Sequence, residues 1–169
     1  ALDRALEAGV ELNKPVMIHI GGSVHDFDEF LVKLRPGDIV THSFTGNLHG
    51  ILDNNNKVID AAWDAMKRGI IFDVGHGGGS FCLRNGVPAI AQGFYPDSIS
   101  TDLHAGSMND GMMDMATTMS KFLVLGMPLV DVIRASTSNP ANEINHPELG
   151  HLSIGAIADV AVLKLEHGT

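Results

Sequence analysis

Four residues with metal-binding side chains follow or end four short apolar stretches of the sequence. They are His19, His42, His76 and Asp102. Neutral imidazole nitrogens and carboxylate oxygens are the ligands that suit zinc and similar divalent ions. A single histidine in such a place is most often a hydrogen-bonded core residue. Four such residues at equivalent places predict a shared metal or catalytic site.

The apolar stretches that precede these residues are typical of buried β-strands. We expect strands at 15–20, 38–44, 69–74 and 98–103, because each is a short run rich in β-branched and apolar residues. Helices are expected where apolar residues recur at helical spacing, at 1–8, 26–35, 57–68, 88–92, 112–125 and 129–136. A helix between successive strands is the connection that parallel strands need.

The alternation of strands and helices predicts an α/β fold that binds ligands at the carboxyl ends of its strands. Four strand–helix units are half of a closed (β/α)8 barrel, which usually needs about 250 residues. An open, doubly wound sheet is the alternative. A further strand expected at 160–163 lies outside this alternation and predicts a small accessory sheet.

Composition excludes several classes of protein. With 11 Lys and Arg against 20 Asp and Glu, the net charge is −9, which argues against sequence-independent binding of nucleic acid. The single cysteine, Cys82, cannot form an internal disulfide and fits a reducing compartment. No apolar run approaches the roughly 18 residues that cross a bilayer. We therefore expect a cytoplasmic protein with neither a nucleic-acid nor a membrane partner.

Other polar residues leave alternatives open. The glycines after His76 resemble an esterase oxyanion loop, but the sequence has no Gly-x-Ser-x-Gly nucleophile motif, so we reject that activity. Gly77 and Gly78 either let backbone N–H groups approach a substrate anion or only turn the chain. His104 lies two residues after Asp102, where contact with substrate and a solvated position are equally expected.

The start of the sequence has the pattern of a helix without a capping residue or a preceding methionine. This pattern predicts a fragment of a longer protein. The alternative is a short native helix from which the initiator methionine has been removed.

The order and spacing of these motifs resemble the amidohydrolase superfamily of metal-dependent barrel hydrolases. Within it, the sequence is most similar to the dihydroorotase-like enzymes called amidohydrolase/deacetylase metallohydrolases. Residues 16–19 resemble the family's strand five, 40–42 strand six and 99–104 strand eight. Residues 138–141 and 155–160 resemble the passage from the last barrel helix to an accessory β domain.

The resemblance implies an α/β fold that is the C-terminal half of a (β/α)8 TIM-type barrel with the start of a small accessory β-sandwich domain. Strands five to eight and their helices would occupy 1–145, and part of the accessory domain 146–169. The implied activity is metal-dependent hydrolysis of amide or ester bonds, of the N-acyl (deacetylase) or cyclic-amide type.

The resemblance also implies roles for particular residues. His19 and His42 would bind the second metal of a binuclear centre, with zinc as the expected ion and two ions per complete site. Asp102 would bind the first metal, take a proton from the bridging hydroxide and pass it to the leaving group. His104, His76, Gly77 and Gly78 would face a small-molecule substrate.

Two features of the family have no counterpart in this sequence. They are a His-x-His pair on the first strand and a carboxylated lysine on the fourth; Lys14 precedes strand five and is not that lysine. We therefore expect the chain to need a missing N-terminal barrel half as its partner and to have little activity alone. The alternative is a non-catalytic half-barrel that binds a metal or small molecule or serves as an oligomerisation module, and a homo-oligomer is open in either case.

Overall fold

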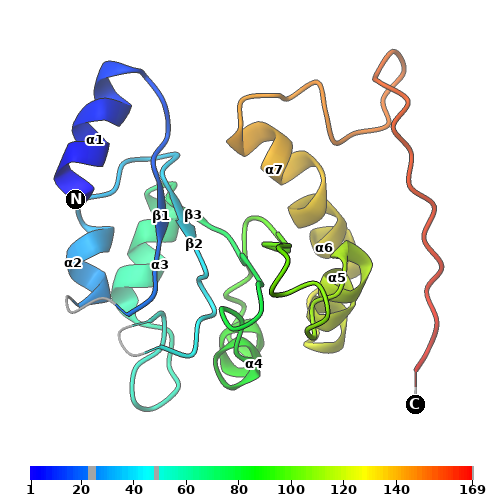
Figure 1. Cartoon of the computed structure of the whole chain (residues 1–169), viewed down its shortest axis with the longest axis horizontal. Coiled ribbons are helices and arrows are strands. Elements are labelled where there is room, and N and C mark those ends of the chain that lie inside the picture. Colours follow the sequence, from blue (N-terminus) through cyan, green and yellow to red (C-terminus); the bar gives the residue numbers. More distant parts are fainter. Residues whose placement is uncertain (23–25, 48–49, 169) are drawn as a thin grey trace.

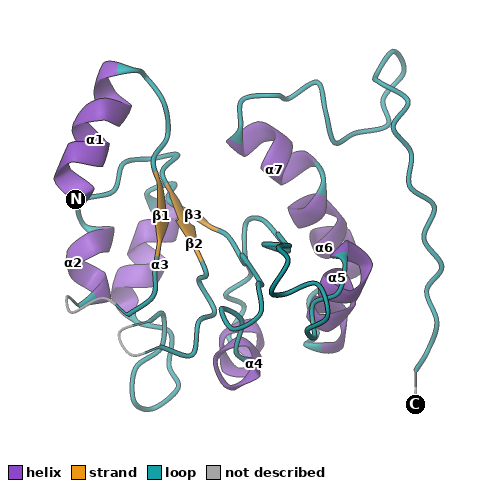
Figure 2. Ribbon diagram, in the orientation of Figure 1, coloured by secondary structure: helices purple, strands orange, loops and turns teal. Residues whose placement is uncertain are grey.

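The computed structural model describes residues 1–22, 26–47 and 50–168, in which helices alternate with short strands (Figures 1 and 2). In chain order the elements are α1 (Leu2–Glu11), β1 (Met17–His19), α2 (Phe27–Leu31), β2 (Ile39–Thr41), α3 (Asp60–Lys67), β3 (Ile71–Phe72), α4 (Leu83–Ala91), α5 (Met115–Val124), α6 (Leu129–Ser136) and α7 (Ser138–Glu143). The alternation of strand and helix therefore agrees with the expected α/β organisation.

The strands form one parallel sheet in the order β1-β2-β3. Met17 pairs with Ile39 and His19 with Thr41, while Val40 pairs with Phe72. Parallel pairing with this register brings the carboxyl ends of the strands to one edge of the sheet. That edge carries the residues singled out from the sequence.

The fourth expected strand, 98–103, lies beside β3 but pairs only in part. Asp73 and Ser98 form an isolated parallel bridge. The N–H groups of Val74 and His76 donate to the carbonyls of Ser98 and Ser100, at 3.1 and 3.0 Å. The alignment of a fourth strand is thus present, although the paired segment is shorter than expected. Its regular backbone ends at residue 102, which has a left-handed φ of 48°.

Helix α4 also differs from the expectation, which placed it at 88–92. It begins at Leu83 and contains Pro88 in its interior. Because proline lacks an N–H group, it normally occupies the first turn of a helix. Here Gly86 before the proline and Ala89 and Ile90 after it are buried, so tertiary packing outweighs the local preference. Helix α7 was not expected at all.

Aromatic side chains join the sheet to the helices beyond it. Phe72 and Phe94 meet edge to face with ring centroids 5.1 Å apart, and Phe44 meets Phe122 of α5 at 5.8 Å. All four rings are fully buried. Such pairs add about 0.5–1.5 kcal/mol each beyond the area that they bury. The core therefore runs beneath the carboxyl ends of β2 and β3 and supports the edge that they form.

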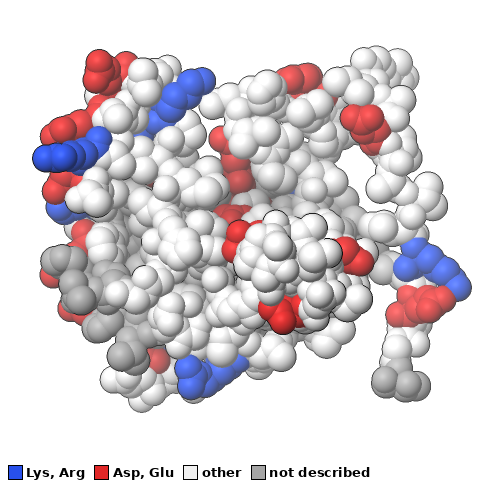
Figure 3. Space-filling view, viewed as in Figure 1, with Lys and Arg blue, Asp and Glu red and all other residues white. Residues whose placement is uncertain are grey.

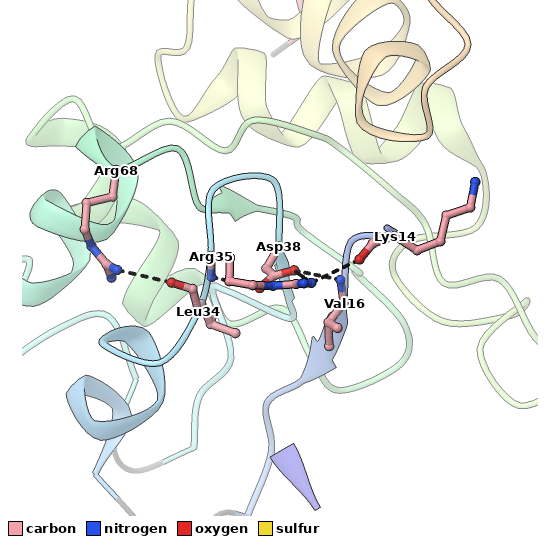
Figure 4. A network of polar contacts seen from close by, with 6 residues as sticks. All are labelled: Lys14, Val16, Leu34, Arg35, Asp38 and Arg68. Carbon is pink, nitrogen blue, oxygen red and sulfur yellow. Dashed lines mark hydrogen bonds and ion pairs between the residues drawn. The ribbon is translucent and has the colours of Figure 1, made fainter. Parts of the chain in front are cut away.

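A polar network ties the amino ends of β1 and β2 together (Figure 4). The Asp38 carboxylate, which is 0% exposed, accepts hydrogen bonds from the Val16 N–H at 2.8 Å and from Arg35 Nη2 at 2.7 Å. Arg35 Nη2 also donates to the Lys14 carbonyl at 3.0 Å. Burial alone would raise the pKa of Asp38, but the hydrogen bonds from Arg35 and Val16 outweigh it and lower that pKa.

The C-terminal segment runs along the side of the molecule as an extended chain (Figure 1). Residues 157–168 contain neither a helix nor a strand, and Val162 is 92% exposed. The strand expected at 160–163 is therefore absent from the described residues, because a strand needs a neighbouring strand for its backbone hydrogen bonds. The accessory β domain and the division at residue 145 stay predictions.

None of the helices in the described part of the chain is both long enough and apolar enough to cross a membrane.

Candidate active site

A cavity of about 550 Å³ lies between the sheet and α7. Its lining includes three of the residues predicted from the sequence, His19, His42 and Asp102, which come from β1, the end of β2 and the fourth aligned segment. Acidic side chains gather around the hollow at the centre of the face in Figure 3. The structure therefore brings together residues that are up to 83 positions apart in the sequence.

His42 is held in one orientation by the backbone of the neighbouring strand. Its Nδ1 lies 2.6 Å from the Gly75 carbonyl oxygen. A carbonyl oxygen can only accept, so Nδ1 carries the proton and Nε2 presents a lone pair. A carbonyl that fixes the tautomer in this way is the usual support for a metal-binding histidine.

His19 Nδ1 lies 3.0 Å from His42 Nε2, and the two rings meet edge to face at 4.2 Å. Bonds of about 2.0–2.1 Å to one Zn²⁺ allow two imidazole nitrogens at this separation. The pair fits two of the ligands of a metal site. Among the residues that the structure describes, no group of three or more His, Cys, Asp or Glu side chains is arranged to hold an ion, so Asp102 shares the cavity without completing a ligand set.

Two glycines make room for these side chains. A Cβ on Gly75 would lie 2.7 Å from His42 Nδ1, and one on Gly77 would lie 2.7 Å from Asp102 Oδ2. The Gly77 N–H donates to the Thr101 carbonyl at 2.9 Å, so it is not free for a substrate anion. Gly78 makes similar room for Asp110. The glycine loop therefore allows close approach of carboxylates, a reason that sequence reasoning did not consider.

The backbone is strained at two of the cavity residues. His42 and Asp102 have φ values of 66° and 48°, in the left-handed region that costs most side chains about 1–3 kcal/mol and costs Asp less. Such strain persists only where the surroundings impose it, and it gathers at functional sites. The strain supports a functional role for this edge of the sheet.

His76 is buried beside the cavity rather than in its lining. Its ring stacks on Phe81 with centroids 4.8 Å apart. Nε2 accepts from Lys121 Nζ at 2.7 Å, and Nδ1 donates to the Gly77 carbonyl at 2.8 Å. Burial lowers the pKa of His76, and the Lys121 charge lowers it further against the opposing bond to Gly77. His76 thus shapes the glycine loop as a neutral imidazole.

His104 lies on the exposed loop after Asp102, and its Nδ1 accepts from the Gly106 N–H at 3.1 Å. Neither His104 nor His76 lines the cavity. Contact of these two residues with substrate stays a prediction.

Two acidic cavity residues were not singled out from the sequence. Asp73 is buried at the end of β3, and the signal for it was an acidic residue inside an otherwise apolar strand. Glu143 belongs to α7, a helix that was not predicted from the sequence. Burial raises the pKa of Glu143 to about 7, with Asp97 and Asp73 adding to the shift and the nearby Ser98 hydroxyl opposing it. Its Oε1 is buried without a hydrogen-bond partner among the described residues.

Known proteins resemble the chain over most of its length. A deacetylase of Brucella anthropi and deacetylase Atu3266 of Agrobacterium fabrum are each 42% identical to it over 154 residues, 91% of the chain and 38% of each relative. A deacetylase of Enterococcus faecalis is 37% identical over 90% of the chain and 42% of the relative. The chain thus spans about two fifths of the length of these relatives.

Solved structures show the same fold. A crystal structure described as an adenine deaminase matches 93% of the chain and 44% of its own, with a TM-score of 0.87 and 37% identity. One described as a dihydroorotase matches 88% of the chain and 42% of its own, with a TM-score of 0.79 and 40% identity. The parallel α/β fold is therefore similar to that of amidohydrolase barrel enzymes. The amidohydrolase family model matches residues 1–168, and the chain belongs to this family.

Proposed function

We propose that the chain is part of a metal-dependent hydrolase that acts on C–N bonds other than peptide bonds, or on esters as a deacetylase. The observation that carries the proposal is the pair of imidazole nitrogens, His19 Nδ1 and His42 Nε2, 3.0 Å apart in a cavity that also holds the Asp102 carboxylate. Relatives named deacetylase, adenine deaminase and dihydroorotase support the same reaction class.

His19 and His42 would hold a divalent ion, for which zinc is our first choice. A bound ion of this kind lowers the pKa of water to near neutrality and polarises a carbonyl. The chain's own contribution is orientation. The Gly75 carbonyl fixes the His42 tautomer, and pairing of β1 with β2 places His19 beside it.

Asp102 is the proposed proton carrier. Its carboxylate lines the same cavity and lies against Gly77, where any side chain would displace Oδ2. A carboxylate placed beside the reacting water can take its proton and deliver it to the leaving nitrogen or oxygen. The left-handed backbone at Asp102 turns the chain here.

The chain spans 38% of the length of two of its deacetylase-named relatives, and we propose that the rest of the protein supplies the remaining ligands. The partner would be the rest of a barrel for which residues 1–145 provide strands five to eight, and the substrate a small molecule. The histidine pair also favours a second candidate, a half-barrel that binds a metal or small molecule without catalysis.

Turnover separates the two candidates. The chain, together with the rest of its barrel, is assayed with zinc on N-acetyl amino acids, a cyclic amide and adenine, alongside Asp102→Asn. We expect hydrolysis of at least one class and its loss in Asp102→Asn, with zinc binding to the histidines retained. Full turnover by Asp102→Asn would contradict the assigned proton carrier, and zinc binding without any turnover would favour the binding module.

A further inference from the structure

Asp73 has a buried carboxylate that the proposed reaction does not use. It is 4% exposed and accepts three hydroxyl hydrogen bonds. Thr41 Oγ1 and Ser100 Oγ donate to Oδ2 at 2.6 and 2.8 Å, and Ser98 Oγ donates to Oδ1 at 2.8 Å. An ionised carboxylate only accepts, so it can satisfy three hydroxyl donors at once.

The three donors come from the strands on either side of β3. Thr41 ends β2 and immediately precedes His42, while Ser98 and Ser100 belong to the aligned segment that leads to Asp102. Asp73 therefore joins three neighbouring strands at their carboxyl ends. Its partners Thr41 and Ser100 lie one and two residues before His42 and Asp102, the positions with left-handed backbone whose side chains line the cavity.

A chain of hydrogen bonds continues from Asp73 to His42. Since the Ser100 hydroxyl hydrogen is directed to Asp73, the Ser100 oxygen is left to accept the Gly75 N–H at 3.0 Å. The carbonyl of the same Gly75 accepts from His42 Nδ1 at 2.6 Å. The chain of bonds thus holds the Gly75 backbone in place, and with it the carbonyl oxygen that accepts from His42.

We propose that Asp73 is a positioning residue that sets the tautomer and orientation of His42 through Ser100 and Gly75. This inference rests on the proposed function in one respect, which is that the orientation presents His42 Nε2 to a metal ion. Asp73 is not itself assigned as a ligand, because its two oxygens are already occupied by three donors in the interior.

An amide at this position would break the direction of the chain. In Asp73→Asn the side chain keeps one accepting oxygen and gains an N–H donor. Ser100 or Thr41 then has to turn its hydroxyl hydrogen elsewhere, and the bond between Ser100 and Gly75 is weakened. The Gly75 carbonyl is then held less firmly against His42 Nδ1, and we expect the His42 proton to be shared between Nδ1 and Nε2.

The test uses the metal-free protein labelled with 15N-histidine at about pH 8, where neutral imidazole prevails in general. Proton–nitrogen correlation spectra report which ring nitrogen of His42 carries the proton, and His42→Asn assigns the signal. We expect Nδ1–H in the unaltered protein and in Asp38→Asn, a matched change of a buried carboxylate at the other end of the sheet. We expect a mixture of tautomers in Asp73→Asn.

Ser100→Ala provides the same test with a smaller change, should Asp73→Asn not fold. It removes the middle link and leaves Asp73 two donors. A folded Asp73→Asn or Ser100→Ala protein whose His42 signals match those of the unaltered protein would overturn the proposal, as would an equal change in Asp38→Asn.

Zinc affinity supplies a second readout. Loss of a supporting partner of a metal-binding histidine typically weakens metal binding about 10- to 100-fold. We expect a loss in this range for Asp73→Asn and none for Asp38→Asn. If the unaltered protein fails to bind zinc, the proposed function is wrong, whereas the tautomer spectra still decide the role of Asp73.

Discussion

The two ends of the parallel sheet each contain a buried carboxylate, and the two carboxylates have different partners. Asp38, at the amino ends, is paired with the guanidinium of Arg35 and with backbone N–H groups (Figure 4). Asp73, at the carboxyl ends, is surrounded by neutral hydroxyl groups. One carboxylate closes an ion pair, and the other organises a network that reaches the cavity.

The backbone conformation also differs between the two ends of the sheet. The carboxyl end has left-handed φ values at His42 and Asp102 and two glycines that carboxylates or imidazoles approach closely. The amino end has a turn at Gly37, where a left-handed φ is at no cost. Backbone strain thus lies at the carboxyl end of the sheet, where we propose the chemistry. The amino end contributes to the stability of the fold. Changes at the two ends should separate these properties.

Replacement of His42 should have the largest effect and the most specific one. In His42→Asn the amide nitrogen can still donate to Gly75, and asparagine tolerates a left-handed φ, so we expect unchanged or increased stability. Zinc binding and turnover should fall by more than about 100-fold, since a ligand matters more than its support. Metal content by plasma mass spectrometry and a thermal melt measure the two effects. His146→Asn, an exposed histidine paired with Glu148, should change neither.

Replacement of Arg35 should lower the stability of the protein and leave its zinc binding unchanged. Arg35→Gln leaves Asp38 buried without its ionic partner, which we expect to lower the free energy of unfolding by about 3 kcal/mol. The lowered pKa of Asp38 gives a stability that is present above the ordinary carboxyl range and is lost as the pH falls through the folded-state pKa. Urea unfolding of the two proteins should therefore converge in strong acid. Loss of zinc affinity per folded Arg35→Gln molecule would break the comparison.

Glu143 should make the free energy of unfolding of the protein depend on pH. Its pKa of about 7 lies above the ordinary value of 4.5, so the folded state favours the protonated form. The stability from this group is complete at low pH and is lost as the pH rises from about 5 to 7. We expect a loss on the order of 2 kcal/mol by pH 8 relative to Glu143→Gln, from urea unfolding at both pH values. Parallel pH profiles of the two proteins would contradict the assignment.

Replacement of Gly77 should give the smallest loss among the variants that we expect to lose stability. Gly77→Ala places a methyl group against Asp102 Oδ2 and strains a left-handed φ of 51°, for a cost of about 1–2 kcal/mol. Gly93→Ala is the matched control, because its φ is also left-handed and nothing lies within 4 Å of its Cβ. Both variants should lose similar stability, but only Gly77→Ala should lose turnover. Equal activity of the two would show that Asp102 does not need this space.

Sequence spacing was enough to predict that three of the candidate site residues gather at the carboxyl edge, because strand ends in a parallel α/β fold share one edge. His19, His42 and Asp102 each end or follow an apolar run, and the fold brings them to one cavity. His76 has the same spacing, but its ring turns toward Phe81 and Lys121. The position of a residue just after a strand does not reveal the direction in which its side chain points.

Other features depend on tertiary contacts that periodicity does not contain. Asp73 is visible in the sequence as an acidic residue in an apolar strand, but its role depends on Thr41, Ser98 and Ser100, which only the fold brings around it. The tail at 160–163 is an apolar run typical of a strand, but it has no neighbour in the described structure to pair with. Helix α4 shows that core burial can carry a helix through a proline.

X-ray absorption at the zinc edge of the metal-loaded protein tests the central claim most directly. The account predicts a zinc shell with at least two imidazole nitrogens at about 2.0–2.1 Å, reduced by one in His42→Asn and unchanged in Asp38→Asn. A zinc shell without imidazole, or one that is the same in His42→Asn, would contradict the assignment of the carboxyl end of the sheet as a metal centre.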